Sequence, residues 1–306
     1  MNDIYFYDFD FNLLYIEKNC ISAMWSINFD DIGSFEAVFP LNSGAIKTVL
    51  ENDYVIAVQG VNHAIVTGKI VSKKGVIYGK TLNWILGKRI VSPQSFNCEC
   101  IDALKKIIND AFADVENFEM EETESIGTIE VEIKNHITAL DAIKKCVNPL
   151  GAGYRVWADI TNKKWILKIL TKNDTDIVMS EDIRNVYNVE YADDLQEVFT
   201  DGVYVDENDV LNTIASDKTG IYKWVCYLDK DTEVDAKEEL SKMKRTVESR
   251  AMTRNFDYPE NFNLGDKVKI RKSGANWEKL SDVFIYGVNI WYDTSVYGSE
   301  PVFKEI

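Results

Sequence analysis

Alternating apolar and polar positions dominate the N-terminal third of the chain. Every second residue of Ser34–Phe39 is a phenylalanine or an alanine, the period of two expected of a strand with one buried side. Pro40 then ends the strand because proline cannot donate to a sheet ladder. Similar runs predict strands at 4–7, 13–16, 21–29, 54–58, 64–71 and 76–79, with a short helix over 42–50 and a helical turn over 80–89.

The pattern changes beyond Ser92-Pro93. Apolar residues recur at helical spacing over 101–112 and again over 138–147, where Thr138 is the expected N-cap. The acidic stretch 116–124 between the two helices is interpreted as a solvated loop. A strand at 128–133 and a hairpin at 153–160 and 165–170 complete the region, so residues 93–182 are predicted to form an α/β insert.

Strand patterns return after the insert, at 186–191, 197–200 and 201–205. Leu240, Met243, Val247 and Met252 then predict one helix over 236–254. A polar-aromatic linker at 256–262 precedes strands at 265–271 and 283–292, which a long loop at 272–282 separates.

The segment 263–292 is a weaker copy of 52–71. Each has an acidic turn residue, an alternating strand, a loop, and a strand that one glycine interrupts, Gly68 or Gly287. A glycine inside a strand usually marks a bulge or a barrel corner. Either two hairpins are alike by chance or the chain holds two related small barrels.

The expected fold is therefore α+β and mainly β. It has two small antiparallel β-barrel-like domains with an α/β insert domain and an additional helix. The domain boundaries would be 1–92 for the first barrel, 93–182 for the insert, and 183–306 for a second β-rich domain with helix 236–254 and the C-terminal barrel strands.

Composition narrows the choice of partners. The 306 residues carry a formal net charge of −16, which argues against nucleic acid and against an anionic membrane surface as partners. This acidity has two readings, solubility or an acidic recognition face. No apolar run approaches the roughly 18 residues of a spanning helix, so no membrane-spanning segment is expected.

The five cysteines and the N-terminal sequence, which does not resemble a secretory leader, favour reduced thiols and synthesis in the cytoplasm. Cys98 and Cys100 form a C-x-C pair that fits buried structural thiols or, less well, a zinc site.

Catalytic signatures are missing from the sequence. Of the two histidines, His63 falls in an expected hairpin loop at the surface, and His136 precedes a helix in a cap or surface role. The chain has no G-x-S-x-G, H-E-x-x-H, P-loop or dinucleotide-binding motif. A glycosidase-type carboxylate pair stays open because carboxylates are plentiful. We expect no catalytic residue, no cofactor and no metal.

Several short patterns resemble the baseplate-hub proteins of bacteriophage tails, also called tail-associated proteins. They are Gly33-x-Phe35-Glu36 leading to Pro40, Asp53-Tyr54-Val55, Thr67-Gly68-Lys69-Ile70, Leu82-x-x-Ile85-Leu86 with Arg89, and Phe262-x-Leu264-Gly265-Asp266-x-Val268. The resemblance extends over most of the chain and includes no catalytic signature.

The resemblance implies a structural component of a phage or prophage-derived tail tip, assembled in the host cytoplasm. Three subunits would form a homotrimeric hub that presents six similar modules to a six-fold tube. Expected partners are the distal tail or tube, tape-measure, and spike or fibre proteins. The alternatives are a tail enzyme that degrades cell wall or polysaccharide, and a receptor-binding module.

The residues expected to matter are structural. Gly68 and Gly287 would allow backbones to approach closely in the two barrels, and Arg89 would anchor the insert. The resemblance adds Gly265 and Asp266, which lie in the shared motif at the start of a late strand.

Overall fold

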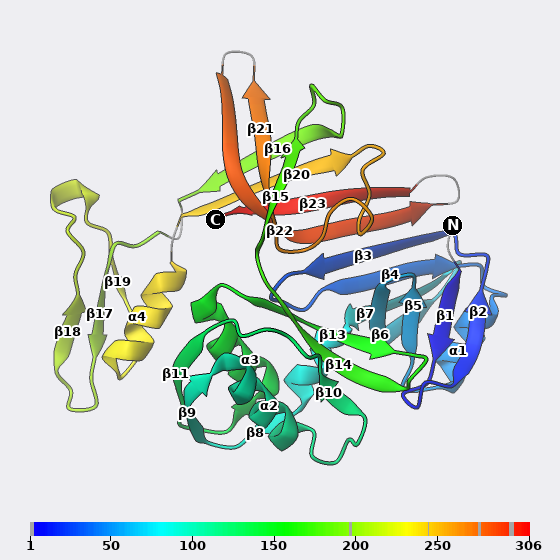
Figure 1. Ribbon diagram of the computed structural model, residues 1–306, viewed down its shortest axis with the longest axis horizontal. Helices are drawn as coiled ribbons and strands as arrows, with labels where there is room; N and C mark the ends of the chain where they lie inside the picture. Colours follow the sequence, from blue (N-terminus) through cyan, green and yellow to red (C-terminus); the bar gives the residue numbers. More distant parts are fainter. Residues whose placement is uncertain (1–2, 196–197, 244, 275–276, 294–296) are drawn as a thin grey trace. The chain divides into compact units, whose positions relative to one another are not determined.

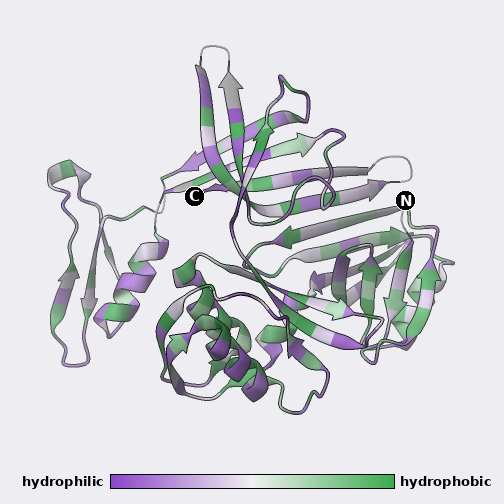
Figure 2. Ribbon diagram, in the orientation of Figure 1, coloured by the Kyte–Doolittle hydropathy of each residue, from purple (hydrophilic) through white to green (hydrophobic). Residues whose placement is uncertain are grey.

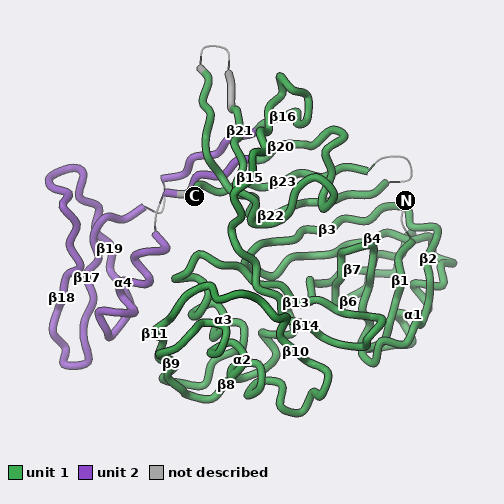
Figure 3. The backbone as a smooth tube through the Cα atoms, viewed as in Figure 1, with its two compact units in different colours: residues 1–189, 250–306 green, residues 190–249 purple. Residues whose placement is uncertain are grey.

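The computed structural model describes residues 3–195, 198–243, 245–274, 277–293 and 297–306. The chain divides into two compact units, one of residues 1–189 with 250–306 and one of residues 190–249 (Figure 3). Strands hold 49% of the residues and helices 18%, which confirms a mainly β fold. Within the described ranges, no helix is long and apolar enough to cross a membrane.

The N-terminal strands form at the places that their alternation predicts. Colouring by hydropathy shows hydrophobic and hydrophilic residues alternating along the strands (Figure 2). Ser43 caps the one helix among them by accepting a hydrogen bond from the backbone N–H of Ala45. The elements are β1 (Ile4–Tyr7), β2 (Leu13–Glu17), β3 (Ser22–Asn28), β4 (Ser34–Phe39), α1 (Gly44–Glu51), β5 (Ile56–Gln59), β6 (Asn62–Val71) and β7 (Gly75–Thr81).

These strands continue into the C-terminal ones in a single sheet (Figure 1). The later strands are β15 (Asn173–Met179), β16 (Val186–Asp194), β20 (Thr246–Thr253), β21 (Asp266–Gly274), β22 (Trp277–Asp293) and β23 (Tyr297–Glu305). The strand order is β16-β20-β23-β22-β3-β4-β7-β6-β5-β1-β2, and β21 pairs with both β22 and β15. The join is antiparallel, with Gly287 of β22 opposite Asn28 of β3 and Asp293 opposite Ser22.

The expectation of two barrels is wrong, because no sheet closes in the described part of the chain. β3 pairs with β4 on one side and with β22 on the other, so the N-terminal strands do not close upon themselves. The expected loop at 272–282 is wrong as well, since β21 continues to Gly274 and β22 begins at Trp277. The domain boundaries 1–92, 93–182 and 183–306 stay a prediction.

The sheet does contain an internal repeat. The neighbours β3-β4-β7-β6-β5 recur as β16-β20-β23-β22-β21, and each set appears in the same order along the chain. In β6 the register against β7 shifts between Val66 and Gly68. In β22 the register against β23 shifts between Ile285 and Gly287. An extra residue thus precedes a glycine at the same place in both hairpins.

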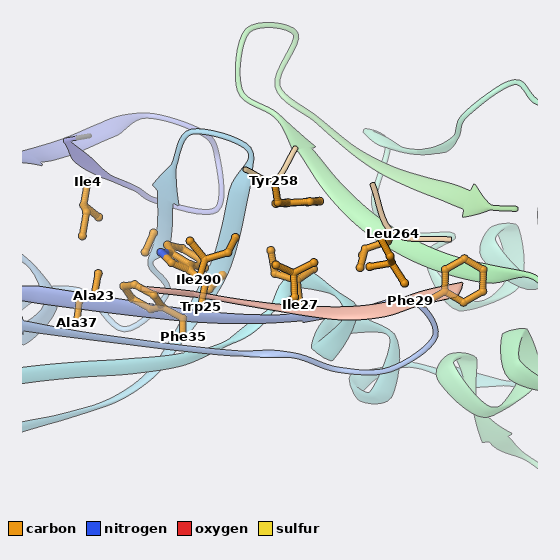
Figure 4. Close-up of a cluster of buried hydrophobic side chains, with 14 of the residues drawn as sticks. Ile4, Ala23, Trp25, Ile27, Phe29, Phe35, Ala37, Tyr258, Leu264 and Ile290 are labelled. Carbon is orange, nitrogen blue, oxygen red and sulfur yellow. The ribbon is translucent and has the colours of Figure 1, made fainter. Parts of the chain in front are cut away.

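A large apolar core lies against this sheet. Figure 4 shows Trp25 of β3 beside Phe35 of β4, with Ile290 of β22 close by. The two aromatic ring centroids are 4.2 Å apart. The indole N–H of Trp25 donates to the buried amide oxygen of Gln59 at 2.7 Å, which satisfies both polar groups inside the core.

A second core joins the insert to β5 and β6 of the sheet, and it is built on helices α2 (Cys100–Ala111) and α3 (Ala139–Val147). Both helices confirm the spacing-based prediction, and Thr138 caps α3 by accepting from the N–H of Asp141. The remaining elements are η1 (Leu82–Lys88), β8 (Ile90–Val91), β9 (Gln94–Glu99), β10 (Phe118–Met120), β11 (Thr128–Ile133), β12 (Ile137–Thr138), η2 (Asn148–Leu150), β13 (Gly153–Asp159) and β14 (Lys164–Leu170).

The acidic stretch 116–124 is not wholly a loop. Phe118 is buried and stacks on Phe112 with ring centroids 4.0 Å apart. This apolar contact supports β10, which pairs parallel to β14, in a stretch whose charges alone predict exposure to solvent.

The second unit, residues 190–249, has a three-stranded sheet in the order β18-β17-β19. Its core consists of the buried side chains Tyr204, Leu228 and Ala236 with a few partly buried neighbours. Its elements include β17 (Asp201–Val205), β18 (Leu211–Ile214), η3 (Gly220–Tyr222), β19 (Val225–Tyr227) and α4 (Glu233–Lys242).

The predicted helix 236–254 is wrong over its second half. α4 ends at Lys242, and Thr246–Thr253 is the strand β20. Ser249, Ala251 and Thr253 are buried alternately along it, so a period of two overrides the helical spacing. Residue 197 of the expected strand 197–200 lies outside the described residues, and 198–200 do not form a strand.

Candidate functional site

The two bulge glycines occupy crowded positions. A Cβ on Gly68 would stand 2.3 Å from the ring of Tyr78. A Cβ on Gly287 would stand 2.9 Å from the side-chain oxygen of Asn28 and 3.1 Å from the carbonyl oxygen of Ile27. The glycine of β22 thus lies where β3 leaves little room for a side chain.

Gly265 and Asp266 shape the turn into β21. Gly265 has a φ of +89°, in the left-handed region that favours glycine, and a Cβ there would stand 2.4 Å from the carbonyl oxygen of Thr171. Its N–H donates to the carbonyl of Ile285, immediately before the β22 bulge. The buried carboxylate of Asp266 accepts from the N–H of Asn263 at 2.8 Å.

Arg89 lies just before the insert and contacts it. Its guanidinium donates to both carboxylate oxygens of Asp114 at 3.0 Å and lies 5.4 Å from the ring centre of Phe112. Its carbonyl accepts from Ala139, the first residue of α3. The structure therefore brings Gly265, Asp266 and Gly287 to one region and leaves Gly68 and Arg89 elsewhere.

A polar joint, meaning a set of hydrogen bonds between the sheet and the insert, was not predicted from the sequence. The side-chain oxygen of the buried Asn83 accepts from the N–H of Val156 at 2.7 Å, and its amide donates to the carbonyl of Asp31 at 3.0 Å. Arg155 of β13 donates to the carbonyl of Val61 at 2.7 Å. The only available signal was a polar residue inside the apolar run Leu82–Leu86.

His63 belongs to the same joint, so its expected place at the surface is wrong. It lies in β6, is buried, and accepts through Nδ1 from the N–H of Ala158 at 3.3 Å. Its ring lies 4.2 Å from that of Trp157. Burial, with a smaller effect from the charge of Arg155, lowers the pKa of His63 to about 3. His136 is exposed, as expected.

The cysteines are free thiols, and Cys20, Cys100 and Cys146 are buried. Burial raises the pKa of the Cys100 thiol to about 11, which keeps it protonated and unreactive at neutral pH. In the ranges that the structure covers, no three His, Cys, Asp or Glu side chains come together as metal ligands.

Several strand edges in the sheet are left open among the described residues, that of the end strand β2 included. β5 pairs with β6 along Asn62–Ile65, and no strand in the described ranges follows on that edge beyond Gly68. Ile70 and Val71 on this segment are 56% and 49% exposed. Among the described strands, β16 pairs with β20 and ends the sheet. Open edges of this kind are templates for pairing with another chain.

The similarity of this chain to known proteins lies in its structure. No family model matches the sequence, and no curated protein matches it. Solved structures do match along nearly the whole chain. The tail protein from Neisseria meningitidis MC58 has a TM-score of 0.63 at 12% identity, over 99% of this chain and 96% of that one.

Two further structures show the same likeness. The 43 kDa tail protein of prophage MuSo2 from Shewanella oneidensis has a TM-score of 0.63 at 10% identity, over 99% of this chain and 98% of its own. The E. coli c3393 protein has a TM-score of 0.51 at 10% identity, over 94% of this chain and 74% of its own. It is described as a type VI secretion component similar to the T4 tail proteins gp27 and gp5. The expected resemblance to phage tail proteins is confirmed at the level of the fold.

Proposed function

We propose, from this fold, that the chain is a non-catalytic structural component of a phage or prophage-derived tail tip. In this role it forms a trimeric hub that joins the tail tube or distal tail ring to spike or fibre proteins. The observation that carries the proposal is the match of nearly the whole chain to phage tail proteins, with 99% of its length covered in two of them.

The internal repeat supports three as the number of subunits in the hub. Each chain carries two copies of the strand set β3-β4-β7-β6-β5, so three chains would supply six copies to a six-fold tube. A structural role also accounts for the positions of Gly265, Asp266 and Gly287, which shape the turn and the bulge beside β3.

The oligomeric mass of the purified protein tests this function. Light scattering across a range of protein concentrations should give a mass of three chains at the upper end. A stable dimer would contradict the hub, because two-fold pairing does not lead to a closed ring of three. Turnover of purified cell-wall material by the protein would contradict the non-catalytic role.

A further inference from the structure

The second unit, residues 190–249, covers one face of its sheet with a helix. α4 packs against β17 and β18, and a Cβ on Gly202 of β17 would stand 3.6 Å from Leu240 of that helix. Tyr204 lies on the same side, since it is two residues further along β17 and is buried in the core with Ala236 of α4. The residues that alternate with them along β17 therefore point away from the helix.

The face that points away from α4 is apolar and exposed, and we call it the open face. Residues paired in register point to the same side of a sheet. The pairing of β17 with β18 and β19 thus defines the open face as Val203, Val205, Leu211, Thr213, Val225 and Tyr227. Leu211, Val225 and Tyr227 are 66%, 46% and 62% exposed. Three strands therefore present large apolar side chains to solvent on one side.

The turn that leads into β19 exposes further apolar side chains and is tied to the sheet. Ile221 and Tyr222 are 85% and 73% exposed. The buried carboxylate of Asp201 accepts from the N–H and the hydroxyl of Ser216, both at 3.0 Å. The same carboxylate lies 3.6 Å from the ammonium group of Lys223. Asp201 thus holds both ends of the turn 216–223 against β17, and the turn presents its apolar side chains from a bonded frame.

The charge of the second unit limits what can cover the open face. Residues 190–249 hold sixteen Asp and Glu against seven Lys and Arg, a net charge of −9 out of −16 for the chain. Each basic side chain that the structure describes there already lies within 4.0 Å of a carboxylate of the same unit. Glu207 and Asp209, in the turn between β17 and β18, and Asp229, just after β19, are exposed. A second copy of this unit, or an anionic lipid surface, would bring like charges together.

We propose that the open face of the second unit binds a different protein, one that surrounds an apolar patch with Lys and Arg side chains. Leu211, Val225 and Tyr227 would form the apolar centre of the contact, and the exposed carboxylates around them would select a basic partner. The inference deepens the proposed function and rests on it only for the setting, because it assigns this surface and this partner chemistry to the chain whatever the number of subunits.

Fluorescence anisotropy with two labelled synthetic peptides tests the open face on the full chain. One peptide alternates Lys and Leu, and the other alternates Glu and Leu, so the two differ in charge alone. The unchanged protein should bind the Lys-Leu peptide and not the Glu-Leu peptide. Leu211→Ser combined with Tyr227→Ser should weaken binding of the Lys-Leu peptide at least tenfold. Val234→Ser is the matched control, because Val234 is 75% exposed on α4, and it should bind as the unchanged protein does.

Equal affinity of the double variant for the Lys-Leu peptide, or binding of the Glu-Leu peptide, would overturn the inference. A smaller oligomeric mass of the double variant in light scattering would overturn it as well, because the open face would then be a contact between copies. Binding of the unchanged protein to phosphatidylcholine vesicles would instead make the face a lipid-binding surface.

Two further measurements keep these outcomes apart. Thermal unfolding of the double variant should match that of the control, and Tyr227→Ser alone should weaken peptide binding by a smaller factor if the pair of changes unfolds the unit. A trimer that does not bind the Lys-Leu peptide would overturn this inference and leave the hub standing. A stable dimer that binds the peptide would do the reverse.

Discussion

Gly68 of β6 and Gly79 of β7 differ in what surrounds them, and this sets the cost of adding a side chain. The atoms that crowd Gly68 belong to the far end of Tyr78, which is 39% exposed and free to swing aside. Those that crowd Gly79 belong to the backbone, since a Cβ there would stand 2.2 Å from the carbonyl oxygen of Ile65.

We predict that Gly79→Ala destabilises the protein more than Gly68→Ala does. Forced backbone shifts cost about 1–3 kcal/mol, so Gly79→Ala should fall in that range and Gly68→Ala near or below its lower end. Denaturant unfolding measures both. Gly87→Ala serves as the control, because its Cβ would meet only Leu140, at an ordinary 3.8 Å. Equal costs at positions 68 and 79 would contradict this account of the crowding.

Burial of His63 makes stability depend on pH. The folded pKa of about 3 lies below the ordinary 6.5, so protons bind the unfolded chain first as the pH falls. The contribution of the neutral ring is complete above pH 6.5 and declines below it. We expect unfolding free energy to fall by up to about 1.4 kcal/mol per pH unit between pH 6 and 5.

Denaturant titrations at several pH values check this dependence. His63→Gln should flatten the decline, whereas His136→Gln should preserve it because His136 is exposed. An identical slope in both variants would show that other groups cause it.

Prediction from the sequence succeeded for single residues whose role depends on the local backbone. Thr138 caps α3, and the interrupted strands shift register at Gly68 and Gly287, because capping and bulging depend on nearby backbone. It failed for His63 and Asn83, whose partners come from β13, far along the chain. A single sequence carries no signal for those pairings.

Among the elements, η1 connects the sheet to the insert through one side chain. Asn83 links the backbone of Asp31 to that of Val156 while buried, so removing its amide leaves backbone groups without partners. Asn83→Ala should therefore cost about 1–3 kcal/mol. Thermal unfolding measures the loss, and Asn162→Ala, which removes an exposed amide paired with Asp159, should cost far less.

The segment 236–254 shows why an element can be mistaken. Leu240, Met243, Val247 and Met252 fit one face of a helix, yet only the first two pack on the core of the second unit. The sheet accepts Thr246–Thr253 as a strand because it buries Ser249, Ala251 and Thr253. Tertiary pairing outweighed a modest helical preference, as it often does for β-branched residues.

For the whole molecule, the two units should differ in stability. Among the described residues of the second unit, the buried hydrophobic side chains are Tyr204, Leu228 and Ala236, whereas dozens of buried hydrophobic side chains support the first. Amides of β17 should thus exchange with solvent well before those of β22, because local opening follows the number of buried apolar contacts. Native-state hydrogen exchange followed by mass spectrometry tests this, and equal protection would contradict it.

Most single strands and helices of the first unit could be predicted, but the way they join could not. The similarity between 52–71 and 263–292 indicated a repeat, yet it suggested two closed barrels. Pairing of β3 with β22 decides for one open sheet, and this pairing depends on residues from opposite ends of the sequence. The alternation of apolar and polar residues indicates which face of a strand is buried, but it does not indicate which strand pairs with it.

The pairing of β3 with β22 also bears on how the chain reaches its native state. During synthesis, Met24 must wait for its partner Trp291 until the chain has been made as far as residue 291. Contacts between such distant residues slow folding, and an unpaired strand is prone to aggregate meanwhile. A nascent or prematurely terminated chain that lacks residues 287–293 would expose β3 as a free edge. Completion of the sheet is thus a late step, and truncated products should be the ones that precipitate.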